Sequence, residues 1–275
     1  MSERMLRDYL GDKGLAVVSA YNASKETMKI SICGVHILND MQISLFLPNG
    51  HQFVDDQLVT VHLDNRTGVA EYDADLKVYR ASFKGRVRLT HPHQVLVDAM
   101  EYQLFYGANI AKKFQESGYH YPTDHRTRSP LPYSPMAQVP SIDIEENDNK
   151  IGILFTYAQN QPHSTVMAFL STINDDIFFI TFKGTFKEQL LSRDNRCYFA
   201  IDSRATFTFE NAIEWNYSII QGEVYEIPKS SPIFSEVQAR FIIKNPWEVG
   251  FFSHPDVVMF HLQAQHVVCP TRGKL

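Results

Sequence analysis

The residues best suited to binding chemistry lie between Thr181 and Leu191, where an apolar run leads through a glycine into a sequence typical of a helix start. Lys183, Thr185 and Lys187 cluster there. Lysine supplies a mobile positive charge and threonine a hydroxyl donor, and free backbone N–H groups at a helix start favour an anion. The segment therefore predicts a site for a terminal phosphate. A capped surface helix whose lysines are only solvated is the alternative interpretation.

The elements that would position this segment are mainly strands. The apolar runs 165–170 and 177–182 flank the turn 174–176, which predicts a β-hairpin. Thr185 followed three residues later by Glu188 is a capping box, so a helix is expected next, with Phe186, Leu190 and Leu191 on its apolar side. Further strands are predicted at 197–201, 206–209, 215–225 with a kink or bulge at Gly222, and 257–262, which 265–269 extends or pairs with.

A second helix is predicted after Ser231, because serine is a favoured N-cap and Pro232 suits the first helical position. Six or so strands with two helices are typical of a small barrel. The expected fold class is therefore mainly β with a few helices, and the C-terminal half is expected to be a six-stranded split β-barrel.

The first half also carries strand patterns. The runs 59–63 and 79–89 alternate between apolar and polar residues, and the second run has a basic outer face formed by Arg80, Lys84, Arg86 and Arg88. The run 108–115 predicts a short helix, and 94–106 fits either a strand or a helix. An N-terminal β-rich domain is expected.

Prolines gather between the two halves. Pro122, Pro130, Pro132, Pro135 and Pro140 precede an acidic and amide-rich run, which favours a linker over a segment packed across one domain. The expected organisation is a β-rich domain over 1–120, a Pro-rich linker over 121–150 and a barrel over 151–275. A weak similarity between 82–87 and 219–224 is explained either by a second related barrel or by chance.

The run from Thr181 to Cys197 resembles a segment of the FMN-binding split barrel of the pyridoxamine 5′-phosphate oxidase-like superfamily. Lys187 stands at that family's usual lysine, and Asn195-Arg196-Cys197 stands where Asn-Pro-x-Val is frequent. The stretch 222–224 and the helix after Ser231 also resemble the family's later strand and helix. The resemblance covers about 152–269 and leaves the first half uncovered.

This resemblance implies a homodimer that binds FMN between its barrels. It implies that Lys187 and Thr185 meet the phosphate, that Lys183 is a further candidate, and that Ser164 and Thr165 contact the flavin, with Thr181 opening the matching stretch. Two features depart from the family pattern: no strand of the type Arg-x-Val-Leu supplies an arginine to the phosphate, and the central hairpin is short. Relatives of this barrel include proteins without flavin and proteins that bind heme.

Composition limits the other classes of function. The 275 residues carry a net charge of −5, which gives no global basic field for nucleic acid. No apolar run approaches the roughly 20 residues that a membrane span needs. The N-terminus does not read as a signal peptide, and three scattered cysteines favour free thiols, so a cytoplasmic location is expected. No phosphate-binding P-loop, nucleophile elbow or zinc spacing occurs, and no metal site is expected.

The basic face of 79–89 suggests a nucleotide as another ligand, although a solvated strand face or a face turned to the other domain explains it equally. The expected function is that of an FMN-dependent oxidoreductase of this split-barrel kind. The alternative is a non-enzymatic module that binds a flavin, heme or nucleotide. The sequence identifies neither catalytic residues, nor a substrate, nor an electron donor.

Overall fold

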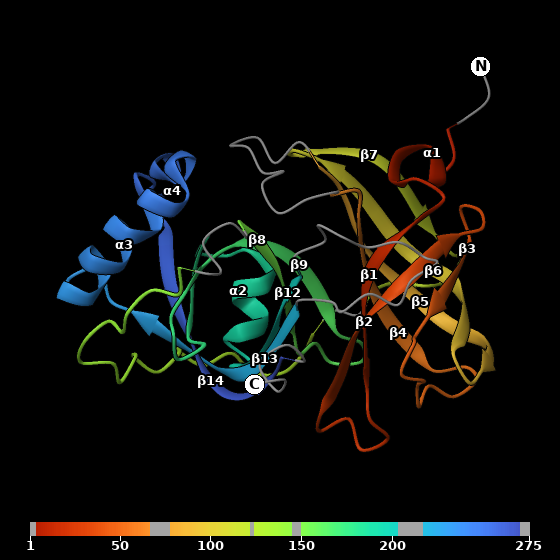
Figure 1. The fold of residues 1–275 in the computed structure, drawn as a ribbon, viewed down its shortest axis with the longest axis horizontal. Helices are drawn as coiled ribbons and strands as arrows, with labels where there is room; N and C mark the ends of the chain where they lie inside the picture. Colours follow the sequence, from red (N-terminus) through yellow and green to blue (C-terminus); the bar gives the residue numbers. More distant parts are fainter. Residues whose placement is uncertain (1–3, 67–77, 122–123, 145–149, 203–216, 270–275) are drawn as a thin grey trace.

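The computed structural model describes residues 4–66, 78–121, 124–144, 150–202 and 217–269. Its strands form two antiparallel sheets that lie side by side (Figure 1). The short helix α1 (Arg7–Leu10) precedes the first sheet. That sheet contains β1 (Lys13–Tyr21), β2 (Met28–Ile37), β3 (Gln42–Phe46), β4 (Leu58–Asp64), β5 (Tyr79–His91), β6 (Gln94–Tyr106) and β7 (Asn109–Gln115).

The first sheet closes on itself into a barrel. Its strand order is β3-β2-β1-β4-β5-β6-β7, and an additional pairing of β3 with β6 joins the two sides of the sheet. Six strands therefore form a closed ring, and β7 continues beyond β6. Alternate residues of these strands, such as Val18, Cys33, Val61 and Phe83, point inward and form one buried apolar core.

The second sheet has the strand order β10-β11-β14-β13-β12-β8-β9. Its strands are β8 (Ile151–Thr156), β9 (His163–Ala168), β10 (Leu170–Ser171), β11 (Ile177–Phe182), β12 (Arg196–Asp202), β13 (Tyr217–Ile227) and β14 (Val257–Val268). Its helices are α2 (Phe186–Leu191), α3 (Pro232–Lys244), the single 3₁₀ turn Pro246–Glu248, and α4 (Val249–Phe252). Figure 1 shows α3 and α4 on the side of this sheet that faces away from the first.

The two sheets share one pattern of connections. In each, the first strand pairs with the second and the fourth, the fourth with the fifth, the fifth with the sixth, and the sixth with the third. In the second sheet β9 and β10 together take the place of β2, since only Phe169 separates them. The second sheet is thus a curled counterpart of the first barrel, which agrees with the predicted split barrel and with a second related barrel.

Glycines mark equivalent positions in the two units. The pairing of β5 with β6 shifts directly before Gly85, and the pairing of β13 with β14 shifts directly before Gly222. A Cβ atom at either glycine would clash with the neighbouring strand, so the backbones approach too closely there for a side chain. Gly50 and Gly184, which follow the third strand of each unit, both have a positive φ, of 75° and 79°. The bulge expected at Gly222 is confirmed.

The two units pack through the outer faces of β1 and β2 against β8, β12 and β13. This contact is itself an apolar core, because Val17, Ile32, Phe155, Tyr198 and neighbouring residues bury one another there. The units are therefore joined by tight packing of side chains.

Three of the predicted elements agree with the structure to different degrees. The predicted helix at 108–115 is wrong: this run forms β7, because its backbone pairs with β6 and that pairing outweighs a weak helical pattern. The ambiguous run 94–106 is strand β6. The predicted hairpin of 165–170 with 177–182 is confirmed only at its turn, where 170–171 pairs with 177–178, because 165–168 belongs to β9 and pairs with β8. The predicted strand 206–209 lies outside the described residues.

The two helices predicted in the second half are present, with one correction. Ser231 caps α3 as expected and accepts a hydrogen bond from the Ile233 N–H. Thr185 begins α2, but its hydroxyl donates to the Phe182 carbonyl at 2.9 Å instead of capping the helix. The Glu188 carboxylate accepts from the Gly184 N–H, one residue earlier than a capping box requires.

The proline-rich run between the sheets follows the second sheet over its described residues 124–144. Tyr133 forms a bridge with Glu226, Ile142 forms one with Thr172, and Val139 is buried beside α3. The domain boundaries at 120 and 150 stay a prediction. Within the described ranges, no helix has both the length and the apolar character needed to cross a membrane.

Candidate functional site

The turn from β11 into α2 brings two threonine hydroxyls together. The Oγ1 atoms of Thr181 and Thr185 lie 3.1 Å apart, within hydrogen-bonding distance. Glycine is required at Gly184, whose φ of 79° lies in the left-handed region. The turn thus places a hydroxyl pair where the strand ends and the helix begins.

Lys187 is the second residue of this short helix, and its side chain has a clearly shifted pKa. Burial, followed by the positive charge of Arg80 on the first barrel, lowers its pKa from 10.5 to about 8. Its ammonium group has no hydrogen-bond or ion-pair partner among the described residues. A cation without a partner at an interface is costly, so this position favours an anionic ligand.

Lys187 belongs to a group of basic side chains between the barrels. Lys84 of β5 is buried, and its Nζ donates to the Pro162 carbonyl at 2.6 Å and to Thr60 Oγ1 at 3.2 Å. Burial holds the pKa of Lys84 well below its usual range. Burial, followed by the charges of Lys84 and Lys187, likewise holds the pKa of His163 well below its ordinary value, so His163 is neutral.

Aromatic rings lie next to these basic side chains. His163 meets the Phe186 ring edge-on at 4.9 Å between centroids, and Tyr121 meets Phe186 edge-on at 5.8 Å. The Lys84 ammonium lies 4.5 Å from the centroid of the Tyr121 ring. The predicted apolar side of α2 is correct for Leu190 and Leu191, whereas Phe186 is partly exposed and joins this aromatic group.

The other predicted residues have surroundings of their own. The Ser164 hydroxyl donates to Ser82 Oγ of the first barrel at 2.8 Å. Thr165 pairs with Leu154, whose side chain faces the interior of the second unit, so neighbouring Ser164 and Thr165 point to opposite faces of β9. Lys183 is exposed and lines a different, small hollow with Arg128 and Glu188. The basic face of β5 is likewise divided, since Arg86 and Arg88 pair with Asp56.

Sequence reasoning missed Tyr121 and the buried arginine Arg66. Arg66 lies between the two units, 3.5 Å from Asp64 and 3.4 Å from Asp202, and donates to the Ile151 carbonyl at 3.1 Å. One signal was available, because Asp64-Asn65-Arg66 and Asp202-Ser203-Arg204 have the same spacing after a buried strand. Among the described residues, no group of three His, Cys, Asp or Glu side chains gathers as a metal site would require.

No family model matches the chain, and no curated protein matches it. Among solved structures, the heme storage protein HutZ from Vibrio cholerae is 16% identical, with a TM-score of 0.38 over 46% of this chain and 89% of that one. A FAD-binding protein from Mesorhizobium loti is 14% identical, with a TM-score of 0.36 over 44% and 83%. A putative pyridoxamine 5′-phosphate oxidase from Listeria innocua is 14% identical, with a TM-score of 0.33 over 44% and 87%.

These matches include a protein of the kind that the run from Thr181 to Cys197 resembles. Lys187 and the basic and aromatic side chains around it form the candidate site.

Proposed function

We propose that the chain binds a phosphate-bearing flavin cofactor between its two barrels, with the phosphate at Lys187. The observation that carries this proposal is the ammonium group of Lys187, which has no partner among the described residues and has a pKa of about 8. A phosphate dianion would supply the missing partner and would favour the protonated lysine.

The side chains around Lys187 are of types that suit FMN, namely hydroxyl donors for its phosphate and aromatic rings for its ring system. The hydroxyls of Thr181 and Thr185 lie at the same turn, and Thr185 would exchange its bond to the Phe182 carbonyl for one to the phosphate. Tyr121, His163 and Phe186 offer an aromatic wall for a ring system. The Gly184 N–H is not available to the ligand, because Glu188 accepts its hydrogen bond and is itself paired with Arg128.

In this arrangement the protein's own residues would bind and orient the flavin. Lys187 holds negative charge, the threonines select oxygen acceptors, and the aromatic group excludes water from one side. A bound flavin would supply hydride or electron transfer, and the expected oxidoreductase activity depends on that chemistry. The family resemblance implies a flavin site between the barrels of two chains. In this protein the two units of a single chain pack against each other, so one chain offers a comparable interface. Homodimerisation stays a prediction.

The test is FMN affinity, measured by quenching of flavin fluorescence, in the wild type, in Lys187→Ala and in Lys183→Ala. Loss of a charge-assisted hydrogen bond is expected to weaken binding roughly tenfold or more in Lys187→Ala. Lys183→Ala is the matched control and should bind as the wild type does, since Lys183 is exposed and lies outside the group. Equal affinity of Lys187→Ala and wild type would overturn the phosphate assignment.

The pH dependence gives a second readout. Binding should weaken as the pH rises through about 8 in the wild type, because Lys187 loses the charge that attracts phosphate. The same fall should be absent from Lys187→Ala. The visible spectrum of the purified protein separates a flavin from a heme, and a bound flavin that no donor reduces would favour the non-enzymatic alternative.

A further inference from the structure

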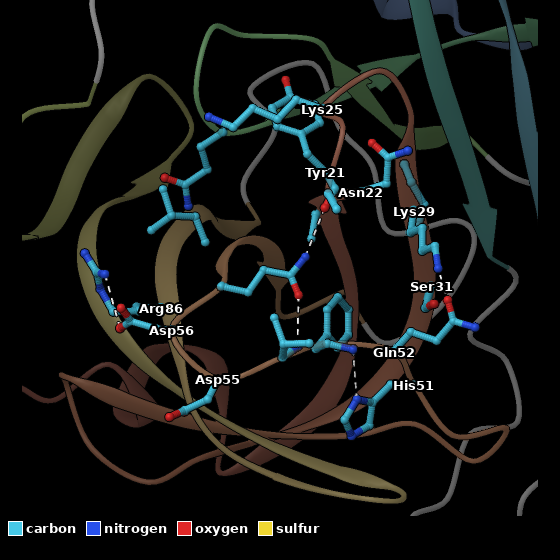
Figure 2. Close-up of a pocket in the computed structure, with 18 of the residues that line it drawn as sticks. Tyr21, Asn22, Lys25, Lys29, Ser31, His51, Gln52, Asp55, Asp56 and Arg86 are labelled. Carbon is cyan, nitrogen blue, oxygen red and sulfur yellow. Dashed lines mark hydrogen bonds and ion pairs between the residues drawn. The ribbon is translucent and has the colours of Figure 1, made fainter.

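The first barrel contains a cavity at its mouth that the flavin proposal does not use. Its volume is about 1480 Å³, and it lies among the end of the β1–β2 hairpin, the loop 49–58 and residues 119–120 (Figure 2). Ligand pockets typically measure about 300–1,000 Å³ and occur preferentially at such places as barrel mouths. The cavity therefore has room for a ligand of several rings.

The two units differ in the segment that follows their third strand. In the second unit the chain after Gly184 forms α2, whose Leu191 enters the core of that unit. In the first unit the chain after the equivalent Gly50 forms no helix before β4 begins at Leu58. Only Phe53 of this loop packs on the barrel core. The part of the chain that forms an apolar helix in the second unit is therefore a loop in the first unit, and this loop lines the cavity.

Hydrogen bonds fix the conformation of this loop in the first unit. The Gln57 side chain donates to the Tyr21 carbonyl at 3.0 Å and accepts from the Val54 N–H at 3.0 Å. His51 Nδ1 accepts from the Phe53 N–H at 3.1 Å, so its Nε2–H donates to the His91 carbonyl at 2.6 Å. These contacts make the hollow a preformed one that costs little to organise on binding.

Two backbone positions on the rim are held in a rarely used conformation. Lys25 has a φ of 59° and Asp56 a φ of 66°, and both line the cavity. A left-handed conformation is strained for a residue other than glycine and persists where surrounding contacts impose it. At Lys25 those contacts come from Asn22, whose carbonyl and side chain accept from the N–H groups of Lys25, Glu26 and Thr27.

The charges around the cavity favour an anion at its hairpin end. The Lys25 ammonium has no partner among the residues that the structure describes, and Lys29 contacts only the neutral Gln52 side chain. Asp56 is neutralised by Arg86 at 3.2 Å and by Arg88 at 3.4 Å. Asp55 is exposed and lies at the opposite end of the view from Lys25 in Figure 2.

The rest of the lining mixes apolar and polar side chains. Phe53 stacks on the His51 ring at 5.6 Å, Val54 and Met100 are further apolar members of the lining, and Gln52, Gln57 and Gln161 are polar ones. A ligand that matches this cavity has a planar apolar body and an acidic group at one end.

We infer that the mouth of the first barrel is a binding site for an amphipathic aromatic anion, with its acidic group at Lys25 and Lys29 and its rings against Phe53. The site is separate from Lys187 and needs no flavin. Its two lysines lie on the β1–β2 hairpin, and its apolar wall comes from the loop that replaces α2.

A matched pair of probes tests this site. Anilinonaphthalene sulfonate carries a sulfonate on two aromatic ring systems, and N-phenylnaphthylamine is the same molecule without that group. We expect saturable one-to-one binding of the sulfonate by fluorescence titration, several-fold tighter than binding of the uncharged probe. In the double variant Lys25→Ala/Lys29→Ala, the sulfonate should bind about five- to tenfold more weakly, while the uncharged probe binds as before.

Controls separate this site from the flavin site. Lys187→Ala should leave binding of the sulfonate probe unchanged, so failure of one proposal does not decide the other. Ser31→Trp, which places a large ring in the cavity, should abolish binding of both probes, and near-UV circular dichroism would verify that each variant stays folded. Equal affinity for the two probes in the wild type, or an unchanged preference in the double lysine variant, would overturn the inference.

Discussion

Tyr21 and Tyr157 stack on each other across the boundary between the two units, with ring centroids 5.7 Å apart and 17° between the ring planes. Tyr21 ends β1, and Tyr157 directly follows β8, the equivalent strand of the second unit. The Tyr21 hydroxyl also donates to the Ala158 carbonyl at 2.6 Å and accepts from the Ala158 N–H at 2.8 Å. Equivalent positions of two similar units therefore meet at their common interface.

Removing one hydroxyl at this contact should destabilise the whole chain. Tyr21→Phe leaves a buried N–H and a buried carbonyl at Ala158 without partners, and the expected loss is about 1–3 kcal/mol in the free energy of unfolding. Urea denaturation would measure it. Tyr133→Phe, which alters an exposed ring, is the control and should change stability by less than about 0.5 kcal/mol. A Tyr21→Phe protein as stable as the control would show that this contact contributes nothing.

Lys187 should make stability depend on pH in the alkaline range. Its folded-state pKa of about 8 lies below the ordinary 10.5, so the unfolded chain holds that proton more tightly. The unfolded state then binds more protons between these values, and stability rises with pH from about 8 to 10.5. Lys187→Met removes the cost of the buried charge, and the variant should be more stable at pH 7 by about 1–2 kcal/mol.

The difference between Lys187→Met and wild type should shrink as the pH approaches 10.5, because the wild-type lysine then becomes neutral in both states. Thermal melts across this pH range would follow it. Lys183→Met, in which an exposed lysine is replaced, should show no such trend, and a pH-independent difference for Lys187→Met would contradict the assignment.

Arg66 should be among the most sensitive buried positions of the interface. It lies between the carboxylates of Asp64 and Asp202 from different units, so Arg66→Met removes one buried cation from the surroundings of both acidic groups. Breaking a buried ion pair from one side costs about 3–5 kcal/mol. Calorimetry should show a lowered melting temperature, and adding Asp64→Asn and Asp202→Asn to the variant should recover part of the loss. Arg66→Met melting like the wild type would exclude this role.

The strand bulges should tolerate no side chain. Gly222→Ala places a Cβ atom against the Gln263 carbonyl, and Gly85→Ala places one against the Val97 side chain. Each is expected to cost about 2–3 kcal/mol of unfolding free energy in denaturant titrations. Gly14→Ala adds its Cβ to open space in β1 and should be neutral, so equal effects at all three positions would argue against strand crowding as the cause.

Local sequence patterns determined the type of many elements. Alternating apolar residues identified β4 and β5, and Ser231 with Pro232 identified the start of α3, because these signals depend on neighbours in the chain. The pattern at Gly222 also predicted its bulge. Local patterns gave the wrong element for the run 108–115, because β7 forms through its pairing with β6. The sequence pattern of β6 was itself ambiguous between a strand and a helix.

The site shows the same division between local and long-range information. The sequence alone grouped Thr181, Thr185 and Lys187 at one turn, and the structure keeps the two hydroxyls together. Only the tertiary structure turned Lys187 toward Arg80 of the other unit and left Lys183 exposed, because helix direction and packing between the units decide which lysine is buried. The cavity of the first barrel was likewise decided in three dimensions, because the β1–β2 hairpin, the loop 49–58 and residues 119–120 that line it are distant in the sequence.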